Sequence, residues 1–242
     1  MSVHSPYAEL LDRMPIERRE VVILGSTTRY WVYGPVDAPL TIVIAHGYRG
    51  EHHGLEPVIA QLPGIRWIGP DMPGFGESTP LTEVPHSIDG FAEWLTAFVD
   101  TLGLSGTAVM LGHSFGTIIS AKAVSAGLKT PALILVNPIS TSGLEGPSKF
   151  ATMVTVAFYR LAGRLPDRWG AFLLKRWIVV QFMSSTLAKT KDRDLRRWIH
   201  DQHHTYFNNF ASRDSVVEAF EASVGSDVST YAGGIHIPTL LV

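Results

Sequence analysis

The chain has 242 residues, of which 45% are hydrophobic and 17% charged, and it contains no cysteine. Its 20 Lys and Arg against 22 Asp and Glu leave no excess of positive charge for a nucleic acid or an anionic membrane surface. The lack of cysteine excludes disulfides, thiolate nucleophiles and thiolate metal ligands. The length suits one large domain, or one domain that carries an insertion.

The N-terminal segment 1–14 lacks the basic start and following apolar run of a secretion signal. Charged residues or prolines interrupt the apolar stretches before they reach the roughly 20 residues that a bilayer crossing needs. We therefore expect a cytoplasmic protein that has no membrane span and binds no nucleic acid. Its oligomeric state stays open.

Short apolar runs alternate with helical patterns in the first part of the chain. Two strands are predicted around a turn at Gly25 and Ser26, and the later runs are typical of strands buried on both faces of a parallel sheet. The predicted strands cover residues 20–24, 28–33, 40–45, 65–69, 107–111 and 132–136, and the predicted helices cover 53–61, 88–102 and 115–126. This alternation predicts an α/β fold with a doubly wound, mostly parallel sheet.

The composition changes near Gly143. Residues 1–143 carry 8 basic against 13 acidic side chains, whereas residues 144–231 carry 12 against 9 and hold 13 of the 24 aromatic residues. From 146 to 221 the pattern is helical, with breaks at 163–167 and near Ser184. The predicted organisation is a sheet core over 1–143, a helical cap over 144–231 and the start of a further core segment over 232–242.

The strongest chemical signal is the sequence GHSFG at residues 112–116, directly after a predicted strand and directly before a predicted helix. This context is typical of a nucleophile elbow, with Ser114 as the nucleophile. Glycine is needed at 112 and 116 because larger side chains would collide with the crossing backbone. The N-terminus of the following helix favours negative charge that develops on a substrate oxygen.

A second turn, HGYRG at residues 46–50, ends another predicted core strand. We expect the backbone amides of Tyr48 and Phe115 to form an oxyanion hole together. Taken alone, the turn is more typical of an ordinary glycine-rich connection, and the order of the two motifs is what favours the oxyanion hole. His46 is interpreted as a structural hydrogen-bonding residue. The residues expected to support the site are His46, Gly47, Gly112, His113 and Gly116.

A third segment, PDMPGFGES at residues 70–78, is by itself only a rigid turn. Together with the two motifs above, in this order and spacing, it resembles the α/β-hydrolase superfamily over essentially the whole chain. The resemblance implies a Ser-His-acid triad with Ser114 as the nucleophile. It also places the acid after a strand like PTLLV at 238–242, so the acid and the histidine, and the C-terminal part of the sheet, are expected beyond Val242.

Candidates for the acid or base within the chain are weak. Asn137 stands where some relatives place the acid, and His236 is interpreted as a loop residue at the edge of the sheet opposite Ser114. The histidines at 200, 203 and 204 share one helical face with a spacing that suits a metal, although a solvated polar face is the simpler interpretation. His52 and His53 either meet substrate or are exposed loop residues.

These patterns favour a serine hydrolase that acts on an ester, thioester or similar carbonyl compound through an acyl-enzyme on Ser114. The aromatic residues of the cap suggest a small-molecule substrate with an apolar group. No metal or cofactor is expected, because serine, imidazole and backbone amides suffice for acyl transfer. Two alternatives remain open: a carbon–carbon bond hydrolase or synthase-like enzyme on the same fold, and a catalytically incomplete, hydrolase-like binding protein.

Overall fold

A computed structural model describes residues 5–145 and 149–242. Within these residues, seven strands form one sheet in the order β1-β2-β4-β3-β5-β6-β7. The strands are β1 (Ile16–Ile23), β2 (Ser26–Tyr33), β3 (Thr41–Ala45), β4 (Arg66–Pro70), β5 (Val109–His113), β6 (Leu133–Val136) and β7 (Thr239–Leu241).

Most of the sheet is parallel. β1 pairs with β2, and β2 with β4, in antiparallel fashion, whereas β3, β4, β5, β6 and β7 pair in parallel. The β1–β2 hairpin turns at Leu24 and Gly25, whose φ angles of 48° and 76° are those of a turn that matches the twist of the strands. The predicted α/β class and mostly parallel sheet are therefore confirmed.

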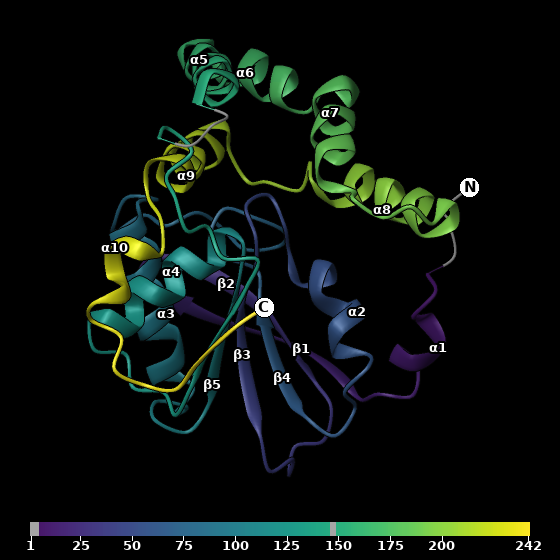
Figure 1. Ribbon diagram of the computed structural model, residues 1–242, viewed down its shortest axis with the longest axis vertical. Helices are drawn as coiled ribbons and strands as arrows, with labels where there is room; N and C mark the ends of the chain where they lie inside the picture. The colour runs from purple at the N-terminus through teal and green to yellow at the C-terminus, as the bar shows by residue number, and fades with distance from the viewer. Residues whose placement is uncertain (1–4, 146–148) are drawn as a thin grey trace.

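Helices cover both faces of the sheet (Figure 1). Along β3, Val43 and Ala45 face α3 (Ile88–Thr101) and α4 (Phe115–Ser125), because alternate side chains of a strand point to opposite faces. Ile42 and Ile44 face the short helices η1 (His52–Leu55) and α2 (Glu56–Ile59). A short N-terminal helix, α1 (Ala8–Leu11), precedes β1. Burial on both faces explains the continuous apolar runs of the central strands.

Between β6 and β7 the described chain is helical. Its helices are α5 (Lys149–Arg164), α6 (Asp167–Leu174), α7 (Trp177–Leu187), α8 (Arg193–Tyr206), α9 (Arg213–Gly225) and α10 (Ser229–Ala232). We call α5 to α9 the cap helices. Figure 1 shows α5 to α8 arranged beyond one end of the sheet, with α9 between α5 and the core. α10 packs on α4 instead.

One predicted helix break is correct, and the other lies a few residues later than predicted, because α7 ends at Leu187 and α8 begins at Arg193. α5 ends at Arg164 and α6 begins at Asp167, as expected for the break at 163–167. α7, however, runs through Ser184, whose side chain is completely buried. A small hydroxyl lets α8 pack closely at this point, so Ser184 marks a helix contact and not a helix end.

The surface of α5, α6 and α7 is unusually apolar. Several large side chains there are more than half exposed: Phe150, Met153, Val154, Leu161, Trp169, Phe172, Trp177, Ile178, Phe182 and Leu187. A helix with the length and hydropathy of a membrane span does not occur in the described part of the chain.

Candidate active site

Ser114 lies in a sharp turn between β5 and α4. Its φ of 51° and ψ of −116° place a non-glycine residue in a region that L-amino acids rarely adopt. The turn is held on both sides, because the Ser114 amide donates to the Val136 carbonyl at 3.0 Å and the Thr117 amide donates to the Ser114 carbonyl at 2.9 Å. The partly exposed hydroxyl therefore stands at the end of the sheet, on a rigid backbone.

The glycines of this turn sit where backbone segments cross. A Cβ on Gly116 would lie 2.0 Å from the carbonyl oxygen of Ala45, and one on Gly112 would lie 2.4 Å from the carbonyl oxygen of Gly116. Both distances are far inside van der Waals contact with backbone that cannot rotate away. The structure thus confirms that larger side chains at 112 and 116 would collide with the crossing backbone.

The HGYRG turn lies beside Ser114. A Cβ on Gly47 would be 3.4 Å from the Ser114 Cβ and 3.2 Å from Nδ1 of His113. Neither the Tyr48 amide nor the Phe115 amide donates to a recorded protein acceptor among residues 5–145 and 149–242. Phe115 is the first residue of α4, where the helix leaves its N–H groups without internal partners. One amide without a protein acceptor in the described residues thus follows the serine directly, and another lies in the turn whose Gly47 is next to it.

His46 anchors this turn to the loop after β4. Its Nδ1 donates to the Gly47 carbonyl at 2.8 Å, and its Nε2 accepts from the Met72 amide at 2.8 Å. Burial lowers the pKa of His46 to about 4, so the imidazole is neutral near pH 7. Both ring nitrogens are occupied by backbone groups, which makes His46 a hydrogen-bonding residue of the scaffold.

Asp71 is the residue that the sequence motifs did not single out. Its carboxylate is completely buried and accepts from the His52 amide at 2.9 Å, from His52 Nδ1 at 2.8 Å and from the Glu77 amide at 2.9 Å. Burial raises the pKa of Asp71 to about 6 and lowers that of His52 to about 3. The sequence feature that could have pointed to Asp71 is an acidic residue directly after a buried strand, in a loop rich in glycine and proline.

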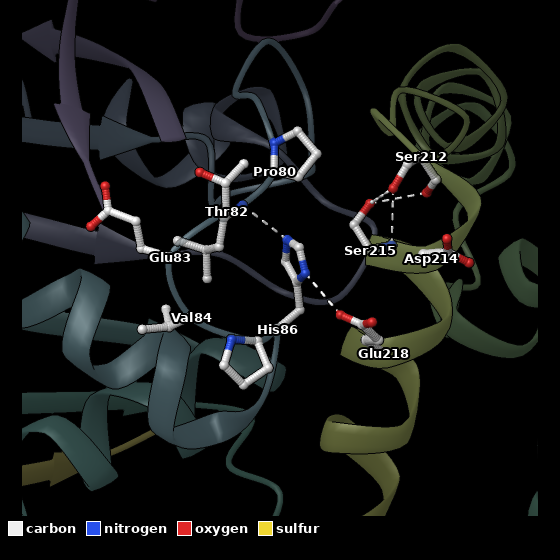
Figure 2. A pocket seen from close by; sticks show the side chains of 11 residues that line it. Pro80, Thr82, Glu83, Val84, His86, Ser212, Asp214, Ser215 and Glu218 are labelled. Atoms are coloured by element: carbon white, nitrogen blue, oxygen red, sulfur yellow. Dashed lines mark hydrogen bonds and ion pairs between the residues drawn. The ribbon is translucent and has the colours of Figure 1, made fainter. Parts of the chain in front are cut away.

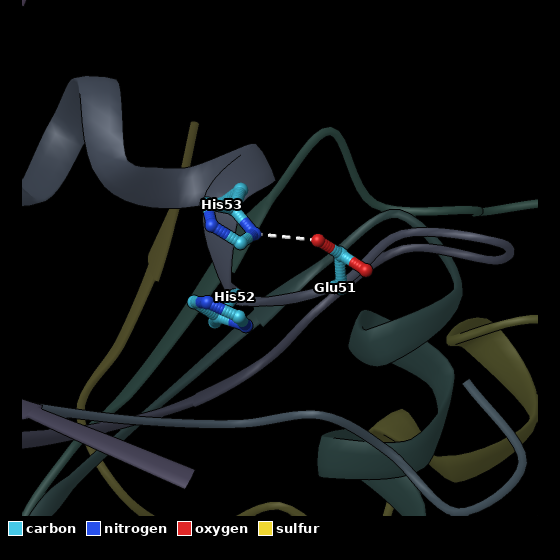
Figure 3. A group of neighbouring side chains, drawn as sticks. All are labelled: Glu51, His52 and His53. Atoms are coloured by element: carbon cyan, nitrogen blue, oxygen red, sulfur yellow. Dashed lines mark hydrogen bonds and ion pairs between the residues drawn. The ribbon is translucent and has the colours of Figure 1, made fainter. Parts of the chain in front are cut away.

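Figure 3 shows Glu51, His52 and His53, whose potential ligand atoms all lie within 4.8 Å of one another. His52 is buried, so its interpretation as an exposed loop residue is wrong. The rings stack in a column that runs from Trp31 on β2 through His52 and His53 to Tyr206 on α8, with centroid distances of 3.3, 3.8 and 4.3 Å. His53 Nδ1 also contacts a Glu51 carboxylate oxygen at 2.5 Å. The arrangement is that of a packed connection between core and cap helices.

The histidines of α8 pack against α7. Nδ1 of His200 lies 2.5 Å from the Ser184 hydroxyl, Nδ1 of His203 lies 2.7 Å from it, and His204 Nε2 contacts Gln181 at 2.8 Å. The interpretation of this face as a solvated polar surface is therefore wrong. Its polar groups satisfy one another in a contact between helices.

A surface pocket of about 490 Å³ lies between α9 and the loop before α3 (Figure 2). It contains Ser215, His86 and Glu218, but their bonds are structural. His86 Nδ1 contacts Glu218 at 2.9 Å while its Nε2 accepts from the Leu81 amide at 3.1 Å, and the Ser215 hydroxyl donates to the Ser212 carbonyl at 3.0 Å. The contact between His86 and Glu218 fastens α9 to the loop before α3, and the other two bonds are local.

The carboxyl ends of β5, β6 and β7 meet at the edge where Ser114 lies. The Asn137 amide donates to the Val242 carbonyl at 2.8 Å, one strand away from the serine turn. His236 lines a pocket with Gly106 and Lys129, which precede β5 and β6 and so mark the opposite edge. Among the described residues, no imidazole is recorded in a hydrogen bond with the Ser114 hydroxyl.

The sheet order, the strained serine turn and the flanking glycine turn define an α/β-hydrolase architecture. The family model described as the alpha/beta hydrolase fold matches residues 41–236. The chain belongs to this family.

Among curated proteins, a pimeloyl-[acyl-carrier protein] methyl ester esterase of Aeromonas hydrophila is 28% identical over 165 residues, which cover 65% of this chain and 60% of that protein. The match thus spans less than two thirds of the length of that relative. Among solved structures, an esterase from Exiguobacterium antarcticum has a TM-score of 0.68 at 19% identity and covers 93% of this chain and 80% of its own. The Cif epoxide hydrolase from Acinetobacter nosocomialis has a TM-score of 0.66 at 16% identity, covering 100% and 81%.

Proposed function

We propose that this protein is a serine esterase in which Ser114 is the nucleophile and the amides of Tyr48 and Phe115 hold the oxyanion. The observation that carries the proposal is the strained backbone of Ser114, which presents the hydroxyl at the N-terminus of α4. Backbone strain of this kind persists where the surrounding structure enforces it, and it clusters at functional sites. The esterase relatives support the same reaction class.

The proposed reaction begins with attack of Ser114 Oγ on the carbonyl carbon of an ester. The C–O bond to serine forms while the carbonyl π pair moves to oxygen, and the serine proton passes to a general base. Collapse of the tetrahedral intermediate expels the alcohol, which takes up that proton. Water then attacks the acyl-serine in the same way and releases the acid. His46 is unsuited to be the base, because backbone groups occupy both of its ring nitrogens.

The amides of Tyr48 and Phe115 supply the electrostatic part of catalysis. They are fixed before the substrate arrives, so no reorganisation is needed as charge develops on the carbonyl oxygen. The N-terminal end of α4 adds a partial positive charge at the same place. A single donor of this kind contributes on the order of 10²–10³ in kcat in well-studied serine hydrolases.

The substrate side of the proposal is an ester or thioester with an apolar group. A helical cap over residues 144–231 would cover the acyl group, and the apolar side chains of its helices suit such a partner. We propose that the protein is located in the cytoplasm. A chain without cysteine is compatible with that reducing compartment, since it needs no disulfide.

The test is covalent labelling of Ser114 with a fluorophosphonate probe, using the protein expressed from its complete coding sequence. We expect labelling of the wild type at the peptide that contains residue 114, and loss of labelling in Ser114→Ala. Ser215→Ala is the matched control, because that hydroxyl is bonded within the N-terminal turn of α9. Labelling that persists in Ser114→Ala would contradict the assignment.

A substrate panel separates the esterase from its alternatives. Turnover of nitrophenyl esters that disappears with Ser114→Ala supports the proposal. Turnover of epoxides or of vinylogous diketones without ester hydrolysis would favour a different reaction at the same site. A folded protein that turns over none of these and is not labelled would favour a binding role.

A further inference from the structure

Arg49 is a completely buried arginine in the turn that carries Tyr48. Its side chain is 1% exposed. Each oxygen recorded as accepting from it is neutral: the carbonyls of Phe207 and Leu174, the Tyr159 hydroxyl and the Asn208 side-chain amide. A buried cation normally needs a carboxylate partner, since moving its charge out of water costs on the order of several kcal/mol. The surroundings of Arg49 must compensate its charge in another way.

The compensation comes from the ends of two cap helices. Leu174 is the last residue of α6 and accepts from Nη2 at 3.2 Å, while Phe207 directly follows α8 and accepts from Nε at 2.8 Å. Carbonyls at a helix C-terminus lack internal partners and carry the negative end of the helix dipole. The Phe210 ring lies 5.3 Å from the guanidinium carbon and adds a cation–π contact.

The remaining bonds extend the contact to two further helices. Nη1 of Arg49 reaches the Tyr159 hydroxyl on α5 at 3.3 Å and Met183 Sδ on α7 at 3.8 Å, and Nη2 reaches Asn208 Oδ1 at 3.1 Å. One guanidinium thus joins α5, α7, the end of α6 and the end of α8. Its planar fork of five N–H donors is what allows this, because a lysine ammonium has three donors at a single point.

The backbone of Arg49 is strained in the same turn. Its φ of 56° lies in the left-handed region, directly after Tyr48. The Tyr48 ring packs on Tyr159, and its hydroxyl donates to the Val216 carbonyl of α9 at 3.0 Å. The position of the turn beside Ser114 and the position of the cap helices are therefore determined by one connected set of contacts.

We propose that Arg49 is a positioning residue that couples the cap helices to the oxyanion turn, so that the Tyr48 amide is in place only when the cap helices are docked. This inference rests on the proposed function for its kinetic consequence. Its structural consequence, a joint loosening of turn and cap when the fork is lost, is independent of any activity.

The test compares Arg49→Lys with wild type. Lysine keeps the charge but cannot reach four acceptors at once, so the turn loses its fixed position. We expect kcat for a nitrophenyl ester, and the rate of fluorophosphonate labelling, to fall about tenfold or more, with KM changed less than about threefold. Arg160→Lys is the matched control, because that exposed arginine bonds Glu221 within the cap helices.

Hydrogen–deuterium exchange provides the readout that does not depend on activity. In Arg49→Lys we expect faster amide exchange both in residues 46–50 and in residues 207–211, and unchanged exchange in β5. If the wild type is not labelled at all, the esterase proposal fails while the exchange result still decides the coupling. Exchange in both segments equal to that of wild type would overturn the inference.

Tyr159→Phe covers the case in which Arg49→Lys does not fold. It removes one acceptor and keeps the ring stacked on Phe220 at 3.9 Å. A partial fall in kcat, about two- to fivefold, with faster exchange in residues 46–50 supports the coupling. The coupling would be contradicted if Tyr159→Phe had the kcat and the exchange of wild type. This holds whether Arg49→Lys fails to fold or folds and has the wild-type rate.

Discussion

At the scale of single residues, the site depends on backbone conformation more than on side-chain chemistry. The turn between β5 and α4 holds Ser114 at a φ of 51°, at the N-terminus of α4. That turn exists because Gly112 and Gly116 leave space for crossing backbone. Glycine here serves close approach, since neither residue has a positive φ.

Gly116→Ala should therefore destabilise the protein strongly, although it adds only one methyl group. The new Cβ would meet the Ala45 and His46 carbonyl oxygens at 2.0 and 2.7 Å, so strand β3 or helix α4 must shift. We expect a loss of about 3 kcal/mol in the free energy of unfolding, measured by urea denaturation. Gly54→Ala is the control, because its Cβ meets nothing within 4 Å, and it should change stability by less than about 0.5 kcal/mol. Equal stability of the two variants would refute the crowding argument.

At the scale of elements, loops after neighbouring strands are tied together by buried polar groups. Asp71 follows β4 and accepts hydrogen bonds from the amide of His52 in η1 and from the amide of Glu77. His46 follows β3 and accepts a hydrogen bond from the amide of Met72. Periodicity cannot reveal such ties, because they join residues far apart in sequence. For the same reason it placed a helix break too early, near Ser184, and could not show that His52 is buried.

Asp71→Asn tests the tie between the loops. Three N–H groups from His52 and Glu77 converge on the two carboxylate oxygens, and an asparagine would present an NH2 group to at least one of them. We expect a loss of about 1–3 kcal/mol in the free energy of unfolding, seen as a lower urea midpoint at unchanged slope. The exposed Asp37→Asn serves as the control. A loss no larger than that of the control would show that Asp71 contributes no net hydrogen bonding.

At the scale of the whole molecule, buried titratable groups connect stability to pH. Burial lowers the pKa of His46 to about 4 and of His52 to about 3, so the folded protein resists protonation that the unfolded chain accepts below its ordinary histidine pKa. Asp71 opposes this effect, because its raised pKa of about 6 favours proton uptake in the folded state. Burial also lowers the pKa of His203 to about 4, so three histidines against Asp71 leave a net loss of stability on acidification.

Stability should accordingly fall as the pH is lowered from 7 to 5. The net difference of about two protons corresponds to roughly 2.7 kcal/mol per pH unit below about pH 6. The measurement is the free energy of unfolding from urea titrations at pH 7, 6 and 5, at about constant ionic strength. A free energy that rises towards pH 5 would mean that the carboxyl group outweighs the histidines.

The sequence alone determined the α/β class, the strands of the parallel sheet and the place of Ser114 between a strand and a helix. These features follow from local rules, because alternation of side chains, burial on both faces and the size of glycine act within a few residues. Only the tertiary structure showed that Asp71 holds two loops, that His52 is buried in a ring column and that Arg49 reaches four cap helices. Such contacts join residues from 19 apart, as for His52 and Asp71, to 159 apart, as for Arg49 and Asn208, and their partners are decided by how the loops and helices pack over the sheet.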